Sequence, residues 1–344
     1  MRSNLMANSD GHYNVVDLFA GVGGLAMGFE ENGFETLFAN DFDEYAAETY
    51  KFNHKNTPFI DGDVSKITEE QIRKIIGDKE VDLVVGGIPC QSFSMAGYRI
   101  RKGIDNSDDP RHFLYKEYFR ILDIVKPKVA IIENVKGILS SHNGGIVKDI
   151  LLSFENRGYK ADYKLLDASD YGVPQARERV IIMANKIGEE NIFPAKHPKK
   201  VPVGDVLKDI PENAPNHEPR KLTGVTLKRV QLLKPGQNWT NLPPELQTKS
   251  IHSGAYGRID PTKPSKTLTT RFDTPSVGYV THPYEDRTLT VREGARIQTF
   301  PDDFVFCGPR LKQYKQVGNA VPVKLSYAIS KGVKAMLDDY YGNQ

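Results

Sequence analysis

A cysteine in an unexpected place raises the question of what chemistry this chain could perform. Cys90 follows a proline in the segment GGIPCQSFS, at the end of an apolar run, and the sequence has only one other cysteine. A structural thiol would be expected inside that run, facing the core. Cys90 instead comes where a buried strand should end, and open α/β sheets bind ligands at this edge. Taken alone, the position fits a structural thiol as well as a reactive nucleophile.

Two further motifs place polar side chains after or before apolar runs. Glu133 and Asn134 end the run in IIENV, and Arg177 and Arg179 lie two residues apart in QARERV, which would put them on one face of a strand. Each motif alone has a simpler explanation, a strand-end cap for ENV and a solvated strand face for RER. Together with Cys90 they favour a pocket, and we expect the thiol, the carboxyl and the guanidinium to lie each at a strand's carboxyl end and to converge at one edge of the sheet.

This trio fits one particular chemical problem. C5 of cytosine is a poor nucleophile and cannot attack a methyl donor unaided. Addition of a thiolate to C6 makes the ring an enamine whose C5 is nucleophilic, which is covalent catalysis. A carboxyl group at N3 and an arginine at O2 would assist the addition; a base then removes the C5 proton and the thiol is eliminated. The three side chains therefore fit methylation of cytosine at C5.

A glycine-rich segment suggests a nucleoside-bearing cofactor. DLFAGVGGLAMGFE (residues 17–30) contains Gly21, Gly23 and Gly24, which would let the backbone turn tightly and approach a ligand at a helix amino terminus. Asp41, after the next apolar run, could bind ribose hydroxyls. These features fit NAD, S-adenosylmethionine or a purely structural turn. Asp17 favours S-adenosylmethionine, because a carboxylate there would repel a pyrophosphate and attract a sulfonium or ammonium group.

The elements that must position these side chains alternate along the first half of the chain. Short apolar segments predict strands at 13–20, 36–41, 81–87, 128–135 and 179–185, and periodic segments between them predict helices at 23–31, 43–52, 69–76, 112–125 and 145–156. This alternation predicts an α/β fold with a doubly wound, mostly parallel sheet. Helical patterns return at 290–300 and 321–341.

Composition separates a basic segment from the rest of the chain. Residues 191–280 hold 14 Lys and Arg against 7 Asp and Glu, together with 12 of the 21 prolines, while the whole chain carries a net charge of only +2. Such a segment suggests either a smaller module with a polyanionic partner or a solvated, loop-rich domain.

Two cysteines exclude a disulfide framework and a cysteine zinc site, and we expect no metal. Without an apolar run of membrane length or a signal core, we expect a cytoplasmic protein that binds no membrane.

Six motifs in order resemble those of the bacterial C5-cytosine-specific DNA methyltransferases, over nearly the whole chain. The segments are DLFAGVGG, GGIPCQSFS, ENVKGIL, QARERV, REGARIQTFPDDF and QVGNAVP. Ile88 stands where the family usually has proline or phenylalanine before Pro-Cys. The resemblance implies a Rossmann-like, S-adenosylmethionine-dependent domain with a smaller target-recognition domain, and a flipped-out target base.

The resemblance also assigns roles to single residues. Cys90 would be the nucleophile, Glu133 would engage N3, Arg179 would support the ring, and Arg177 and Asn134 would brace the pocket. The expected DNA-binding residues, in and beside the catalytic loop, are Gln91, Ser94, Arg99 and Arg101. The expected cofactor residues are Asp17, Phe19, Gly21, Gly23, Gly24, Asp41, Phe42, Asp63, Val64, Pro89, Leu114, Asn319 and Val321. S-adenosyl-L-homocysteine would be the product.

The same resemblance predicts how the chain is divided and what it meets. We expect a discontinuous catalytic domain at 1–188 and 308–344, closed by packing of the 321–341 helix beside the glycine-loop helix, and a small domain at 189–307. Residues 191–250 would read bases in double-stranded DNA. We expect a monomer associated with the nucleoid through DNA, and its functional pair would be a restriction endonuclease.

Other enzymes would explain fewer of these motifs. A tRNA-directed relative would share the chemistry, but a smaller insertion and PPCQPFT in place of IPCQSFS would be expected. A nicotinamide dehydrogenase would leave Cys90, Glu133 and Arg179 without a role, and a binding-only module would not need the thiol.

Overall fold

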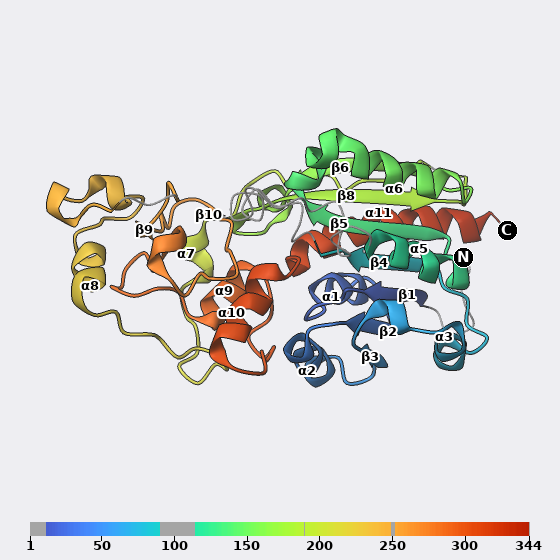
Figure 1. Ribbon diagram of the computed structural model, residues 1–344, viewed down its shortest axis with the longest axis horizontal. Coiled ribbons are helices and arrows are strands. Elements are labelled where there is room, and N and C mark those ends of the chain that lie inside the picture. Colours follow the sequence, from blue (N-terminus) through green and yellow to red (C-terminus); the bar gives the residue numbers. More distant parts are fainter. Residues whose placement is uncertain (1–11, 90–113, 189, 249–251, 344) are drawn as a thin grey trace, which may run out of the picture.

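The computed structural model describes residues 12–89, 114–188, 190–248 and 252–343. Figure 1 shows two lobes side by side: a large lobe built on a twisted sheet, and a small lobe made mostly of residues 203–306. The last described helix, at residues 323–342, ends on the side of the large lobe away from the small one.

The large lobe contains a seven-stranded sheet in the order β3-β2-β1-β4-β5-β8-β6. The neighbours β1 and β2, β1 and β4, β2 and β3, and β4 and β5 pair in parallel, whereas β8 is antiparallel to both β5 and β6. The expected α/β class with a mostly parallel sheet is thus confirmed. The strands are β1 (Tyr13–Leu18), β2 (Phe34–Asp41), β3 (Phe59–Asp61), β4 (Leu83–Gly87), β5 (Val129–Val135), β6 (Lys160–Asp167) and β8 (Glu178–Asn185).

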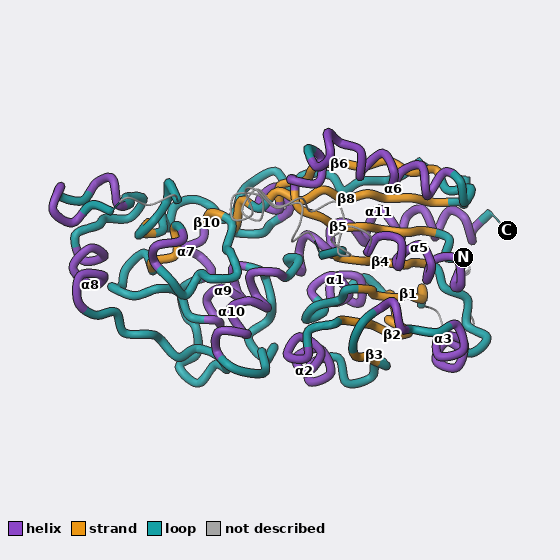
Figure 2. The backbone as a smooth tube through the Cα atoms, viewed as in Figure 1, coloured by secondary structure: helices purple, strands orange, loops and turns teal. Residues whose placement is uncertain are grey.

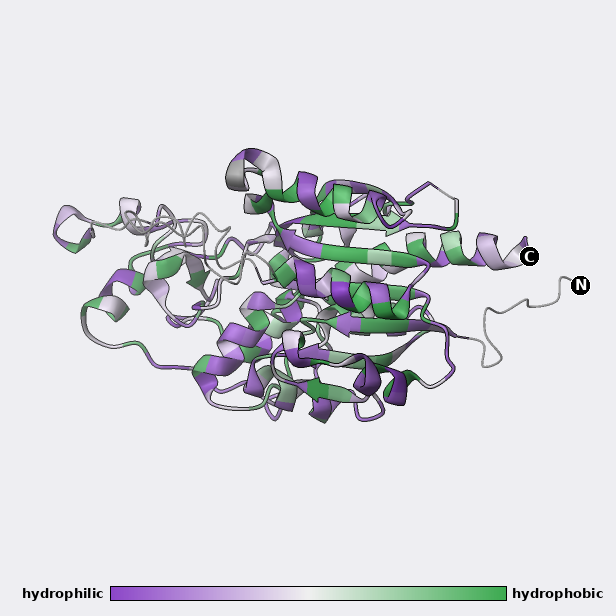
Figure 3. Ribbon diagram, turned by 45° about the vertical axis from the view of Figure 1, so that its right-hand side comes forward, coloured by the Kyte–Doolittle hydropathy of each residue, from purple (hydrophilic) through white to green (hydrophobic). Residues whose placement is uncertain are grey.

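Helices cover both faces of this sheet because its central strands are apolar on both faces. Side chains of α3 (Glu69–Ile76), α5 (Leu114–Val125) and α6 (Gly145–Glu155) share one buried cluster with Val16 and Leu18. Those of α1 (Gly24–Glu30) and α11 (Val323–Gly342) share another with Val15 and Leu83. Figure 3 shows the result, hydrophobic strands between helices whose outer faces are hydrophilic. Among the described residues of the first half, the remaining α-helix is α2 (Glu44–Asn53).

The carboxyl-terminal helix lies against the glycine-loop helix, as predicted. A Cβ on Gly28 would lie 2.5 Å from the Cβ of Ser326, so α1 and α11 touch backbone to side chain. Ser326 Oγ donates a hydrogen bond to the carbonyl of Leu25 inside this contact. The end of the chain therefore completes the large lobe.

The small lobe has little regular structure, as the tube in Figure 2 makes plain. Its strands β9 (Gly257–Arg258), β10 (Ser265–Lys266) and β11 (Tyr279–Thr281) have two or three residues each, and β10 pairs with β7 (Gln175–Ala176) of the large lobe. Its α-helices are α7 (Val203–Val206), α8 (Gly224–Gln231) and α9 (Val291–Ile297). The helix α10 (Arg310–Asn319) packs on α9 where the lobes meet. The described 3₁₀ turns of the small lobe are η6 (Trp239–Asn241), η7 (Pro244–Leu246) and η8 (Pro275–Val277). Those described in the large lobe are η1 (Val64–Lys66), η3 (Lys136–Leu139), η4 (Ser141–Gly144) and η5 (Ala168–Tyr171).

The predicted strands and helices are present within a few residues of their expected bounds wherever the structure describes them. Two strands of the seven-stranded sheet, β3 and β6, were not predicted, nor were the short strands β7, β9, β10 and β11 outside it. Both β3 and β6 lie at the edges of the sheet, and β6 is exposed along most of its length, so it lacks the apolar run of a buried strand.

Candidate active site

A buried ion pair lies at the edge of the sheet that the carboxyl ends of the parallel strands form. Glu133 is the fifth residue of β5, and its Oε1 lies 2.7 Å from Nε of Arg179 on β8, with side chains only 12 % and 11 % exposed. The two strands are antiparallel neighbours, so Arg179 lies near the amino end of β8 and not at a carboxyl end as expected. Convergence of the carboxyl and the guanidinium was predicted correctly, because the amino end of an antiparallel strand meets the carboxyl end of its neighbour at the same edge. Whether the Cys90 thiol joins them stays a prediction.

Asn134 ties this pair to the segment that leads to Cys90. Its Nδ2 donates to the carbonyl of Ile88 at 3.2 Å, and a Cβ on Gly87 would lie 3.7 Å from Oε2 of Glu133. The chain therefore leaves β4 directly beside the carboxylate. Cys90 itself lies outside the described residues, as do Gln91, Ser94, Arg99 and Arg101.

Arg177 has a different environment from Arg179. It lies between β7 and β8, outside both strands, so the expectation that the two arginines share one strand face is wrong. Its side chain is buried, and its guanidinium donates to the carbonyls of Leu268 (3.2 Å), Gly318 (2.9 Å) and Ala320 (3.1 Å). Burial, with the nearby charge of Arg179, lowers the pKa of Arg177 well below its usual value. This arginine braces the junction of the lobes.

Two buried glutamines that sequence reasoning missed complete the junction. Gln175 Nε2 donates to Oε1 of Gln298 at 2.9 Å, and Gln298 Nε2 donates to the carbonyl of Val317 at 2.8 Å. Gln175 also accepts from the backbone N–H of Leu268. Both glutamines lie inside the recognised motifs, QARERV and REGARIQTF, but no pattern in the sequence marks either of them as buried at the junction.

The glycine loop surrounds a carboxylate without a partner. Asp17 is fully buried, and neither of its oxygens has a hydrogen-bond partner within the described chain. Burial, together with the charges of Glu30 and Asp41, raises the pKa of Asp17 well above its usual value. Gly21 and Gly23 above it have φ of 57° and 87°, as a tight turn requires. An orphaned acid beneath such a turn fits a ligand with a positive end.

The ends of β2 and β3 supply the other cofactor candidates. Asp41 accepts hydrogen bonds from the backbone N–H of Gly21 (2.7 Å) and Asp43 (2.8 Å), one on each oxygen, which leaves lone pairs for hydroxyl groups. Phe42 is 80 % exposed, unusual for a phenylalanine and suited to stacking on a base. Asp63 caps η1, accepting from the N–H of Ser65, and Val64 is buried behind it.

The remaining candidates lie in the glycine loop, in the carboxyl-terminal block and at the two ends of the segment 90–113. Gly24 approaches the carboxyl-terminal block closely: its Cβ position is 2.4 Å from the carbonyl of Val321, so this glycine is required by packing. Asn319 is exposed at the end of α10, and Val321 is buried. Phe19 has a positive φ of 55° at the turn, while Pro89 and Leu114 lie partly buried at either end of the undescribed segment.

A cleft of about 930 Å³ separates the lobes and reaches the ion pair. Val135, Lys136, Glu178 and Arg179 line it from the large lobe, and Asn238, Gly254, Lys266, Thr269 and Tyr279 are among those that line it from the small lobe. Tyr279 is fixed there, since its ring packs on Gly254 and Gly257 and its hydroxyl accepts from Asn238 at 2.7 Å. Sequence reasoning did not single out these lining residues outside the motifs, because no pattern marks them.

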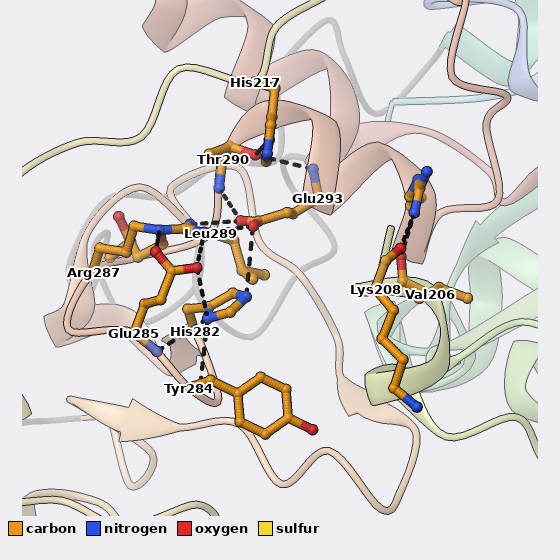
Figure 4. Close-up of polar contacts among 12 residues, drawn as sticks. Val206, Lys208, His217, His282, Tyr284, Glu285, Arg287, Leu289, Thr290 and Glu293 are labelled. Carbon is orange, nitrogen blue, oxygen red and sulfur yellow. Dashed lines mark hydrogen bonds and ion pairs between the residues drawn. The ribbon is translucent and has the colours of Figure 1, made fainter. Parts of the chain in front are cut away.

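A buried polar cluster holds the small-lobe side of the cleft in shape. Figure 4 shows Arg287 between Glu285 and Glu293, with His282 beneath and Thr290 capping α9. Burial would raise the pKa of Glu293, but Arg287 and His282 lower it below its usual value. Burial lowers the pKa of His282, and the charge of Glu293 opposes that shift. The cluster anchors the loop that follows β11, and hence Tyr279.

The described residues contain neither a candidate metal-binding group nor a candidate membrane-spanning helix. No group of three or more His, Cys, Asp or Glu among the described residues could hold a metal ion. Within the same residues, no helix has the length and apolarity needed to span a membrane.

Comparison with known proteins agrees with this geometry. The model of the C-5 cytosine-specific DNA methylase family matches residues 13–335. The chain is 36 % identical over 329 residues to Type II methyltransferase M1.HphI of Haemophilus parahaemolyticus, covering 93 % of this chain and 86 % of that protein. It is 34 % identical over 354 residues to M.NgoFVII of Neisseria gonorrhoeae, covering 98 % and 91 %.

A solved structure resembles the whole fold. It belongs to a prophage-encoded protein of E. coli described as a DNA modification methyltransferase, with a TM-score of 0.75 at 26 % identity, covering 95 % of this chain and 99 % of that one. The family match spans both lobes and all six motifs. The chain therefore belongs to the C-5 cytosine-specific DNA methylase family and is a DNA cytosine-5-methyltransferase of the restriction-modification type.

Proposed function

We propose that the enzyme methylates C5 of a cytosine flipped out of a short, specific duplex site, with S-adenosylmethionine as donor and a covalent Cys90–C6 adduct on the way. The observation that carries this proposal is the buried Glu133–Arg179 pair at the cleft. Asn134 beside it holds the carbonyl of Ile88, two residues before Cys90. The acid and the cation are thus joined to the described residues that lead toward Cys90, which supports the proposed role of its thiol.

In the proposed reaction, the thiolate of Cys90 forms a bond to C6 of the cytosine. Glu133 engages N3 and Arg179 holds O2, two atoms on one edge of the ring, which suits side chains 2.7 Å apart. C5 becomes nucleophilic and takes the methyl group as the donor's carbon–sulfur bond breaks. A base then removes the C5 proton, and the electrons of that C–H bond re-form the ring double bond and expel the Cys90 thiolate.

The cofactor proposal rests on Asp17 and its surroundings. S-adenosylmethionine would supply an electrophilic methyl group, and S-adenosylhomocysteine would leave. The unpartnered carboxylate of Asp17 would complement the positive end of the ligand. Asp41 would accept from the ribose hydroxyls, and exposed Phe42 would stack on the adenine. The other contacts would come from Phe19, Gly21, Gly23, Gly24, Asp63, Val64, Pro89, Leu114, Asn319 and Val321.

DNA would occupy the cleft between the lobes. A base within a duplex cannot reach a pair as buried as Glu133 and Arg179, so it must leave the stack. We assign catalysis to residues 1–188 and 308–344 and target reading to the small domain, 189–307, chiefly within 191–280. We further propose that the enzyme acts as a monomer on DNA at the nucleoid. Protection of host sites from a cognate endonuclease would be the function of a restriction-modification methyltransferase.

One experiment tests the nucleophile and the substrate together. Wild-type protein, Cys90→Ser and the control Cys307→Ser are incubated with S-adenosylmethionine and either tRNA or duplex DNA carrying 5-fluorocytosine. In this base C5 carries fluorine in place of the proton, so the thiol cannot be eliminated and the adduct persists. We expect a denaturant-resistant DNA adduct with wild type and with Cys307→Ser, and none with Cys90→Ser. An adduct with the Cys90 variant, or one formed on tRNA alone, would refute the proposal.

A further inference from the structure

An exposed ion pair inside the cleft has no structural explanation. Lys136 Nζ lies 3.1 Å and 3.0 Å from the two carboxylate oxygens of Glu178, and both residues line the cleft beside Arg179. Their side chains are 58 % and 47 % exposed. Ion pairs this exposed contribute little to folding stability. A role in binding would explain the pair better than a role in folding.

A carboxylate is out of place in a cleft proposed to hold a polyanion. The lining contains Lys136, Arg179 and Lys266, but also Asp167 and Glu178. Asp167 has a structural role, because it accepts from the backbone N–H of Ser169 and of Arg177. Glu178 lacks such a role, since within the described chain its carboxylate accepts hydrogen bonds from Lys136 only.

The position of the pair relates it directly to the target base. Lys136 follows the last residue of β5, Val135, which pairs across the sheet with Arg179. Glu178 is the first residue of β8 and precedes Arg179. The ammonium group of Lys136 therefore stands at the mouth of the Glu133–Arg179 pocket, where the backbone of an extruded nucleotide must pass.

We infer that Lys136 binds a DNA phosphate next to the extruded cytosine, and that Glu178 occupies Lys136 until the phosphate displaces it. This inference rests on the proposed function. Glu178 holds the ammonium group of Lys136 at the pocket and competes with any phosphate that binds there. Lys136 is therefore positioned for the extruded nucleotide but binds other polyanions less tightly. Glu178 thus lowers the affinity for DNA in general and favours departure of the methylated product.

The test measures binding of a labelled duplex without a defined target over a series of NaCl concentrations, by fluorescence anisotropy. The variants are Lys136→Gln, Glu178→Gln and the double substitution. Matched controls are Lys51→Gln and Asp61→Asn, which break a similar exposed pair at the opposite side of the sheet, where Asp61 ends the edge strand β3. Unchanged melting temperatures check that each variant folds.

We expect Lys136→Gln to weaken binding severalfold and to reduce the log–log salt slope by about 0.9, the contribution of one phosphate. Glu178→Gln should tighten binding severalfold in the wild-type background and have no effect once Lys136 is gone. The controls should bind as wild type does. A Glu178→Gln variant that matches wild type, or that still tightens binding without Lys136, would overturn the exchange. A wild-type protein without salt-dependent DNA binding would instead count against the proposed function.

Discussion

The two lobes satisfy their backbones by different means. In the large lobe the strands pair with one another, so the ladder takes up the N–H and C=O groups and apolar packing does the rest. In the small lobe, strands of two or three residues leave many carbonyls without a ladder partner. Buried arginines act as donors in place of a neighbouring strand's N–H groups. Arg258 donates to the carbonyls of four residues, Val230, Leu233, His282 and Glu285, and to the Asp286 carboxylate.

Arg292 repeats this arrangement nearer the junction. It is fully buried and donates to the carbonyls of Pro215, Pro301 and Phe304. A guanidinium has five N–H groups in a fixed plane, so one side chain can join several irregular segments. The comparison teaches that the shape of the small lobe depends on a few buried polar anchors, whereas the shape of the large lobe depends on its ladder and apolar packing.

The largest effect should follow from removing one such anchor. Arg258→Met keeps the length of the side chain but removes the guanidinium donor from the carbonyls of four residues and from the Asp286 carboxylate. Of the four, the carbonyl of Val230 keeps a hydrogen bond from the N–H of Leu233. We expect the free energy of unfolding to fall by about 3 kcal/mol or more, since unsatisfied buried groups each carry a penalty. Urea denaturation, followed separately by fluorescence of Trp239 in the small lobe and by circular dichroism, measures the loss.

The matched change in the large lobe is Ile131→Val on β5, which is fully buried. Loss of one methylene group should cost only about 0.5–1.5 kcal/mol. Affinity for S-adenosylmethionine should survive Arg258→Met, because the cofactor candidates lie in the large lobe and at its junction. Equal losses for the two variants would remove the contrast between the lobes.

The same contrast explains how far the sequence could predict the structure. Strands such as 128–135 are apolar because they are buried on both faces, and this physical cause leaves a visible pattern. The pocket acids Asp17 and Glu133 end or interrupt such runs and were visible for that reason. Gln175 and Arg258 have no such mark, since their role depends on carbonyls brought together by distant segments.

The direction of β8 was beyond the sequence for a related reason. An apolar strand reads the same in either direction, and antiparallel pairing with β5 depends on the loop from β6, a strand that was itself not predicted. Arg179 was therefore placed at the wrong end of its strand but at the correct edge of the sheet.

An intermediate effect, of opposite sign, should come from Asp17→Asn. Asp17 is buried without a partner, so its charge opposes folding, and we expect the amide to raise the free energy of unfolding by about 1–3 kcal/mol. Affinity for S-adenosylmethionine should fall at the same time, because the positive end of the ligand loses its counter-charge. Isothermal calorimetry and thermal unfolding of the ligand-free protein measure the two effects.

The pH dependence of this gain is fixed in sign. The pKa of Asp17 is raised in the folded protein, so wild-type stability falls as pH rises from the unfolded pKa, about 3.9, through the folded one. Asp17→Asn removes that fall. The gain in the free energy of unfolding from Asp17→Asn should therefore grow as pH rises above about 3.9 and disappear below that pH. A gain that is constant with pH would mean that the carboxylate is not its cause.

The smallest effect on stability should accompany a clear loss of binding at Phe42. This side chain is 80 % exposed at the end of β2, so Phe42→Ala should change the free energy of unfolding by less than about 0.5 kcal/mol. If the ring stacks on the adenine, its loss should weaken S-adenosylmethionine binding by up to about tenfold, the value of one good aromatic contact. The control is Phe52→Ala on α2, whose side chain is 51 % exposed and is not among the cofactor candidates; it should leave affinity unchanged. Equal affinities for the two variants would show that exposure of Phe42 serves no ligand, and the large lobe would then hold its cofactor without an aromatic contact at this edge.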